Sequence, residues 1–251
     1  MKQLYLEACV GSVACGQAVS ALGVNRLEFC ANLEIGGTTP SLASFPLLRA
    51  GCDCAINVLI RPRSGDFLYS DAEFSTMLAE IEQFRAMGAD GFVVGVLTKD
   101  GILDVPRMAQ AITAAGGLPV TLHRAFDMTQ DIFATLDLAA QLGIATVLTS
   151  GQAPDGLQGI AMLKQLQAYS AGRVEIMACG GINADKIAPI YHETGVKTFH
   201  MAGLQLCESE MAYRNPNLSM GSKDFDEYTL RKASPALFAA AVQVRDTLNR
   251  G

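Results

Sequence analysis

The stretch QLGIATVLT, residues 141–149, carries the pattern that decides the fold: a glycine that ends a helix, followed at once by a short apolar strand. The same order recurs in ALGVNRLEF at 21–29, AMGADGFVV at 86–94 and ETGVKTFH at 193–200. Glycine readily adopts the left-handed conformation in which many helices end. The recurrence therefore indicates short connections between helices and strands rather than a binding site.

Working outward from these stretches, apolar runs typical of strands occur eight times along the chain. They lie at residues 4–9, 25–30, 55–60, 91–94, 118–122, 145–149, 173–178 and 196–200. Segments with helical periodicity separate them, for example 71–87 and 131–142. Eight strand–helix units predict an α/β fold of the (β/α)8 TIM-barrel type, with residues 1–251 forming a single domain.

A polar segment at about 204–233 follows the eighth strand and precedes a final helix at about 235–249. We expect this segment to be irregular, because it contains few apolar runs. Long loops in compact domains are often lids or insertions, and this one begins near the expected mouth of the barrel. Both roles, a lid and a passive insertion, remain open.

The composition excludes several classes of function. The chain has 251 residues and a formal net charge of −6, which argues against general binding to nucleic acid or to anionic membranes. It contains no apolar run of roughly 18 residues that would predict a membrane span. Seven cysteines, an odd number, favour a reducing compartment, so we expect a cytoplasmic protein. A homo-oligomer is compatible with these features.

Polar and sulfur-bearing residues mark the C-terminal ends of most predicted strands. These ends meet at one mouth of a TIM barrel, where active sites are built. The residues are Glu7, Cys9, Glu28, Cys30, Arg61, Arg63, Asp66, His123, Arg124, Asp127, Thr149, Ser150, Cys179, Gly180, Gly181 and His200. The sequence therefore predicts a polar mouth.

Cys9 and Cys30 lie at the ends of two consecutive strands, which are neighbours in a barrel. Two thiols at this spacing form a soft ligand pair that suits Cu(I) and that Zn²⁺ also accepts. The alternative is that both thiols only fill the barrel, because cysteine is commonly buried. The pair Cys52 and Cys54 precedes the third strand and is expected at the opposite end of the barrel.

A second group of residues suggests an anion site. Gly180 and Gly181 resemble a phosphate-binding turn, and Arg61 and Arg63 provide two guanidinium groups. Alternatively, the glycines form an ordinary turn, and the arginines pair with glutamates inside the barrel. The full set of candidates for binding an anion or phosphate is Arg61, Arg63, Arg124, Ser150, Gly180 and Gly181.

Candidates for acid–base catalysis are Glu7, Glu28, His123 and Asp127, because a carboxylate beside a histidine can shift the pKa of either group toward neutrality. Asp127 has two further interpretations, a cap for a helix that starts near Thr129 and a partner for Arg124. The sequence contains no P-loop and no HExxH motif.

Several motifs together resemble the CutC copper-homeostasis family over residues 6 to about 231. The motifs are LEAC (6–9), LEFC (27–30), GGTTPS (36–41), IRPRSGDFLYSDAEF (60–74), LTKDGILD (97–104), TLHRAFDM (121–128), LTSG (148–151), CGGI (179–182), YRN (213–215) and LSMGS (218–222). The resemblance implies a cytoplasmic TIM barrel linked to copper handling, with Cys9 and Cys30 as Cu(I) ligands. Gly11, Cys179 and Met201 depart from the family pattern, and the last two add soft donors near the mouth.

Two hypotheses follow. In the first, the chain is a copper-homeostasis protein that binds Cu(I) through Cys9 and Cys30. In the second, it is an enzyme that acts on a small anionic or phosphorylated metabolite, because copper binding alone does not require the polar residues of 61–63 and 123–127.

Overall fold

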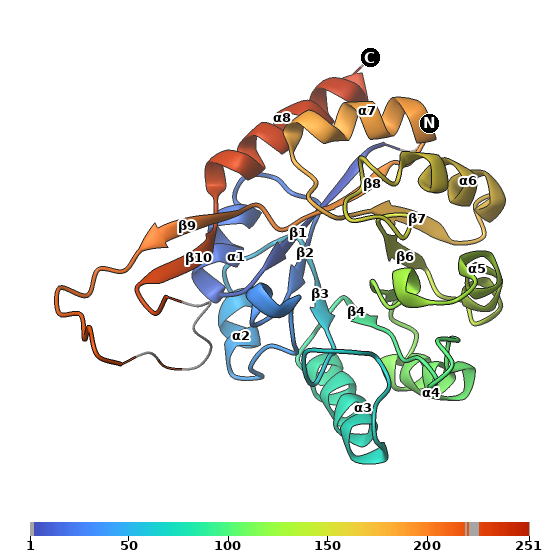
Figure 1. Cartoon of the computed structure of the whole chain (residues 1–251), viewed down its shortest axis with the longest axis horizontal. Coiled ribbons are helices and arrows are strands. Elements are labelled where there is room, and N and C mark those ends of the chain that lie inside the picture. Colours follow the sequence, from blue (N-terminus) through green and yellow to red (C-terminus); the bar gives the residue numbers. More distant parts are fainter. Residues whose placement is uncertain (1–2, 219, 221–225, 251) are drawn as a thin grey trace.

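Eight parallel strands close into a barrel in the computed structural model, which describes residues 3–218, 220 and 226–250 (Figure 1). The strands pair in sequence order, and the last pairs with the first. They are β1 Tyr5–Val10, β2 Arg26–Phe29, β3 Ala55–Leu59, β4 Gly91–Val94, β5 Val120–Leu122, β6 Thr146–Thr149, β7 Glu175–Ala178 and β8 Thr198–Met201. The predicted (β/α)8 barrel is confirmed, and every strand begins and ends within two residues of its predicted bounds.

Helices surround the barrel and connect its strands (Figure 1). They are α1 Val13–Ser20, α2 Ser44–Arg49, α3 Asp71–Ala86, α4 Val105–Ala115, α5 Ile132–Gln141, α6 Ile160–Ser170, α7 Ala184–Thr194 and α8 Pro235–Arg250, with 3₁₀ turns at Leu33–Ile35 and Phe126–Met128. Local signals set their starts: the Ser70 side chain and Glu73 form a reciprocal capping box at α3. No helix in the described part of the chain is long and apolar enough to cross a membrane.

The recurring glycines have the expected backbone conformation. Gly23, Gly88, Gly143 and Gly195 have φ values of +82°, +90°, +72° and +75°, which is the left-handed region. Each follows the end of a helix and precedes a barrel strand by a few residues. Their interpretation as structural connections is confirmed.

The barrel has separate outer and inner cores, because successive strand residues point to opposite sides. The large core lies between the outer faces of the strands and the helices, where for example Phe45 and Phe84 meet edge to face at 5.6 Å. Two small clusters form separately from this core, and both include cysteines of the predicted mouth. The first contains Cys9, Cys30, Leu59 and Val93, and the second contains Leu148, Met177 and Cys179.

The segment at 204–233 is more regular than the sequence predicted. Strands β9 Leu204–Glu208 and β10 Thr229–Ala233 pair as an antiparallel ribbon that projects away from the barrel (Figure 1). Most of their side chains are at least partly exposed, so the apolar alternation that would reveal a half-buried strand is weak. Residues 219 and 221–225, which include part of the motif at 218–222, lie outside the described residues.

Candidate functional site

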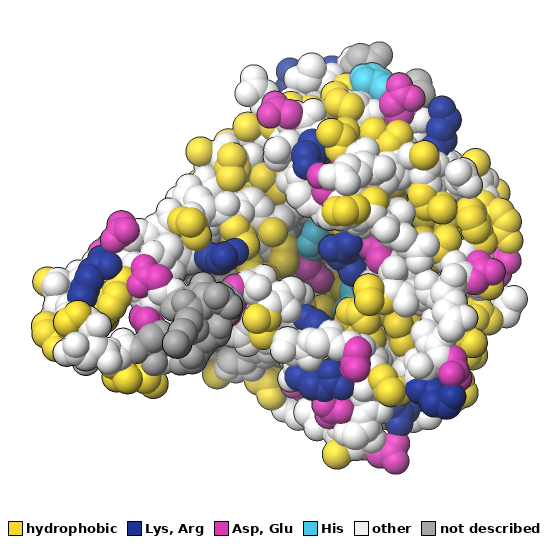
Figure 2. Space-filling view, viewed as in Figure 1, with side chains coloured by type: hydrophobic (Ala, Val, Ile, Leu, Met, Phe, Trp, Pro, Cys, Tyr) yellow, Lys and Arg dark blue, Asp and Glu magenta, His cyan; other side chains and the backbone are white. Residues whose placement is uncertain are grey.

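A cavity of about 840 Å³ lies at the C-terminal ends of the strands, as the sequence predicted. Figure 2 shows a hollow near the centre of this face in which histidine, acidic and basic side chains gather. The predicted mouth residues that line the cavity are Cys9, Glu28, Cys30, Arg61, Asp66, His123, Arg124, Asp127, Cys179, Gly180, Gly181 and His200. Glu7, Arg63 and Ser150 do not line it.

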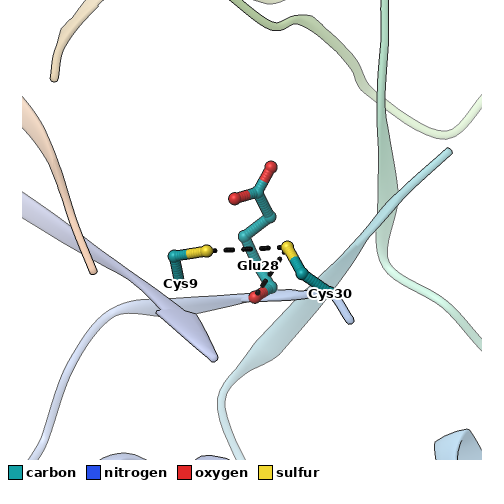
Figure 3. A group of neighbouring side chains, drawn as sticks. All are labelled: Cys9, Glu28 and Cys30. Carbon is teal, nitrogen blue, oxygen red and sulfur yellow. Dashed lines mark hydrogen bonds between the residues drawn. The ribbon is translucent and has the colours of Figure 1, made fainter. Parts of the chain in front are cut away.

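The two predicted thiols meet at one wall of this cavity. The Sγ atoms of Cys9 and Cys30 are 3.5 Å apart, and the side chains point toward one another (Figure 3). Pairing of β1 with β2 sets Cys9 opposite Glu28, so Cys30 follows two residues later on the same face. Both cysteines are buried and pack against Leu59 and Val93.

Glu7 lies two residues before Cys9 on β1 and has a partner on each neighbouring strand. It lies in register with Arg26 of β2 and His200 of β8. Its Oε2 accepts a hydrogen bond from Arg26 Nε at 2.5 Å, and its Oε1 lies 2.7 Å from His200 Nδ1. Burial by itself raises the pKa of Glu7, but Arg26 and His200 outweigh it and hold that pKa at about 2. Glu7 is therefore a fixed negative charge.

His200 connects this carboxylate to the thiols. Its Nε2 lies 3.6 Å from Glu28 Oε2, on the ring side opposite Glu7. Burial disfavours the charged imidazole, but the charge of Glu28 and hydrogen bonds with Cys9 and Glu7 raise the pKa of His200 well above its ordinary value. His200 is therefore an imidazolium near neutral pH.

The thiols and Glu28 respond to this cation and to one another. A hydrogen bond from Cys30 lowers the pKa of the Cys9 thiol to about 5, with a further contribution from His200. Burial and the neighbouring Cys9 sulfur raise the pKa of Cys30. Burial and the charge of Cys9 raise the pKa of Glu28. At neutral pH this wall thus favours a thiolate at Cys9 and a thiol at Cys30.

His123 lies in a different environment. Its Nδ1 accepts a hydrogen bond from the Ala125 N–H at 3.1 Å, which places the ring proton on Nε2. Burial and then the charge of Arg61 lower the pKa of His123 to about 3. No carboxylate pairs with it among the described residues. The arrangement expected around His123, a histidine beside a carboxylate, is instead found at His200.

The two candidate arginines are directed differently. Arg61 is buried, and its guanidinium donates to the backbone carbonyls of Ile35, Gly37 and Gly65. The side chain of Arg63 instead pairs with Glu73 at 2.6 Å and with Asp66, outside the cavity lining. Neither arginine pairs with Glu7 or Glu28, so the ion network considered for them is wrong, because Arg26 takes the position beside Glu7.

Asp127 ties two strand ends together. Its carboxylate accepts hydrogen bonds from Arg124 Nε at 3.0 Å and from the Ser150 backbone N–H at 3.0 Å. The pairing with Arg124 is confirmed, whereas the helix-cap interpretation is wrong, because Asp131 caps α5. Both oxygens of Asp127 are engaged in these and other contacts within the two loops.

The Gly180–Gly181 turn lines the cavity, and both residues have positive φ. A Cβ atom on Gly180 would lie 3.1 Å from the Ser150 Cβ, so this turn packs closely on the loop after β6. Cys179, which precedes the turn, also lines the cavity, and burial raises the pKa of its thiol.

The sequence pattern assigns no role to Arg26 and places His200 at the mouth without a partner. The signal that could have found both is the barrel topology itself. In a closed eight-stranded barrel, the neighbours of β1 are β2 and β8. A buried glutamate on β1 therefore faces a basic residue at the matching position of each of these strands.

Comparisons with known proteins agree with this architecture. The model of the CutC family matches residues 4–205. A family protein CutC of Bacteroides thetaiotaomicron is 43% identical over 230 residues, covering 91% of this chain and 92% of the relative. Another, from Mesorhizobium japonicum, is 40% identical over 241 residues, covering 94% of this chain and 92% of the relative.

Solved structures have a similar fold. A CutC from Streptococcus agalactiae, named for copper homeostasis, superposes with a TM-score of 0.75 at 31% identity, covering 79% of this chain and 98% of that one. A thiamine phosphate pyrophosphorylase from Pyrococcus furiosus reaches a TM-score of 0.59 at 14% identity, covering 98% of this chain and 96% of that one. The second likeness concerns the fold alone.

Proposed function

The chain belongs to the CutC family, and on that premise we propose that it serves copper homeostasis in the cytoplasm by binding Cu(I) through the sulfurs of Cys9 and Cys30. The observation that carries the proposal is the 3.5 Å approach of two buried sulfur atoms at the wall of an open cavity. Thiolates are soft ligands that select Cu(I) over harder cations. The free cysteines also fit a reducing compartment.

The surroundings of the thiols support a soft monovalent ion. Leu59 and Val93 pack against the pair and provide a dry, apolar surface. The one carboxyl group whose oxygen lies within 4.8 Å of both sulfurs is Glu28, among the described groups of candidate ligands. Burial raises the pKa of Glu28 well above its ordinary value, so a hard cation would have to compete with a proton for this carboxyl group. These features favour Cu(I) over Zn²⁺.

One of the two proposed sulfur ligands is already ionised before the metal binds. Cys9 is already a thiolate near neutral pH, because Cys30 donates to it and His200 lies close by. Binding of the cation then requires one more proton to leave, that of Cys30. The affinity for Cu(I) is therefore expected to increase with pH. The increase should stop once the pH is high enough to ionise Cys30 without the metal.

The test is a competition titration of the reduced protein with Cu(I) and a calibrated chelator. We expect one Cu(I) per chain, and loss of this binding in the double variant Cys9→Ser, Cys30→Ser. The matched control is Cys52→Ser, Cys54→Ser, because those two cysteines precede β3, at the opposite end of the strands from the cavity. Equal binding by the wild type and the Cys9, Cys30 variant would refute the proposal, as would tighter binding of Zn²⁺.

A further inference from the structure

The cavity offers far more space than a copper ion needs. Its volume of about 840 Å³ lies in the range of pockets for small organic molecules, which is ~300–1,000 Å³. Apolar side chains line much of it beyond the thiol pair: Leu33, Leu59, Met128, Leu148, Ile182 and Leu237. A pocket of this size and lining calls for a ligand with an apolar body and a few polar groups.

Arg61 brings an unneutralised positive charge to this cavity. It is 7% exposed, and it forms no ion pair with any described acidic residue. The nearby acids are engaged elsewhere, Asp66 with Arg63 and Asp127 with Arg124. Three of the five N–H groups of Arg61 donate to neutral backbone carbonyls, and Nε has no partner among the described residues.

Tyr69 is buried near this guanidinium, and in the described part of the chain its hydroxyl makes no hydrogen bond of normal geometry. Tyr69 is neutral and therefore cannot compensate the charge of Arg61. A buried charge without a counterion is costly, so this side of the cavity favours a negatively charged group.

His123 contributes a hydrogen-bond donor beside that charge. The ring turns its Nδ1 edge toward the backbone of Gly95 and Ala125. Its Nε2–H finds no partner within the residues that the structure describes, although His123 is only 4% exposed. Its neutral form persists because of burial and because of Arg61. His123 therefore offers an N–H group but no proton to transfer near neutral pH.

Phe67 brings the two groups together. The guanidinium carbon of Arg61 lies 5.3 Å from the centre of the Phe67 ring, and the His123 ring lies 4.8 Å from it. Phe67 also lines the cavity, and its backbone carbonyl is fixed by the Leu97 N–H at 2.9 Å. Phe67 therefore holds the guanidinium and the imidazole on the same side of the cavity.

From this arrangement we infer that the β3–β5 side of the cavity binds a small organic anion, whose acid group pairs with Arg61 and accepts a hydrogen bond from His123 Nε2. The acid is a carboxylate or a phosphate ester, and the rest of the ligand lies against the apolar lining. The inference goes beyond the proposed copper binding and does not depend on it, because it uses neither Cys9 nor Cys30.

The experiment measures binding of benzoate, phenyl phosphate and the neutral benzamide to the full chain by calorimetry and ligand-observed NMR. We expect at least one acid to bind in the millimolar range or tighter and benzamide not to bind. Binding of benzoate alone identifies a carboxylate site, and binding of phenyl phosphate alone identifies a phosphate site. Failure of both acids to bind, or equal binding of benzamide, would overturn the inference.

Variants test whether the acid binds at the β3–β5 side of the cavity. His123→Phe keeps a ring against Phe67 and removes the donor, so affinity should fall about tenfold or more, whereas His123→Gln restores an N–H donor. Arg61→Gln should lower the affinity at least as much as His123→Phe does. Arg63→Gln is the control and should leave the affinity unchanged, because the Arg63 side chain lies outside the cavity lining. Unchanged affinity in both His123→Phe and Arg61→Gln would place the anion elsewhere and overturn the inference.

Copper binding is separated from anion binding by the double variant Cys9→Ser, Cys30→Ser. This variant should bind the acid as the wild type does, even though it should lose Cu(I). Loss of acid binding in this variant, with the fold intact by circular dichroism, would show that the anion requires the thiols and would contradict the assignment to Arg61 and His123.

Discussion

The two walls of the cavity differ in how their buried polar groups are partnered. On the β1–β2–β8 wall, Glu7 is neutralised by Arg26 and His200, and Cys9 and Cys30 contact each other. On the β3–β5 wall, Arg61 has no acidic partner and His123 has an unsatisfied N–H group among the described residues. The first wall thus pairs its buried carboxylate Glu7 within the protein, whereas the second leaves the charge of Arg61 without an acidic partner among the described residues.

The difference between the walls shifts the pKa values of the two histidines in opposite directions. Both are largely buried, and burial lowers the pKa of each. Two glutamates near His200 reverse the effect and raise its pKa, whereas the cation Arg61 near His123 adds to it. The sign of the neighbouring charge, and not the degree of burial, decides which histidine is charged.

The largest expected effect comes from removing the carboxylate of the complete wall. Glu7→Gln leaves Arg26 and His200 without their counterion in a fully buried position, so the free energy of unfolding should fall by ~3–5 kcal/mol near pH 7. Urea unfolding measures this loss. The exposed Glu82→Gln serves as the control, and a loss as small as that of the control would show that Glu7 is not part of a stabilising network.

The effect of Glu7 should depend on pH with a defined sign. The folded-state pKa of about 2 lies below the ordinary value of 4.5, so the stabilisation is present above pH 4.5 and is lost as the pH falls toward 2. This shift corresponds to ~3 kcal/mol. The difference in unfolding free energy between the wild type and Glu7→Gln should therefore shrink over that interval, and a constant difference would contradict the assignment.

A direct comparison of the histidines should give a smaller effect. His200→Phe removes a charged hydrogen-bond partner of Glu7 and should cost ~2–3 kcal/mol, whereas His123→Phe removes a neutral ring with one bond and should cost ~1 kcal/mol or less. Thermal and urea unfolding of the two variants measure the difference. Equal losses would mean that the two walls do not differ as described.

The smallest change concerns thiol reactivity rather than stability. Cys9 and Cys179 both line the cavity, but the pKa of Cys9 is lowered to about 5 and that of Cys179 is raised by burial. Iodoacetamide should therefore modify Cys9 before Cys179 near pH 7, and the rate at Cys9 should change little as the pH rises further. Mass spectrometry of the modified peptides measures the order, and earlier modification of Cys179 would contradict the prediction.

Part of the site follows from local sequence and part does not. Cys9 and Cys30 could be paired from the sequence, because they lie at the ends of strands that are consecutive in the chain and therefore neighbours in the barrel. The role of His123 could not be predicted, because its titration depends on Arg61, which reaches it from another strand end. The ribbon formed by β9 and β10 escaped prediction because its exposed side chains show little apolar alternation.

The sequence by itself determined the barrel and the position of its mouth, since helix-ending glycines such as Gly143 and Gly195 and the apolar runs after them are local signals. Only the tertiary structure decided which buried charges meet. Glu7 and His200 are 193 positions apart and become partners because β8 closes onto β1. Charge pairing depends on distances of a few ångströms, and these exist only after the barrel has closed.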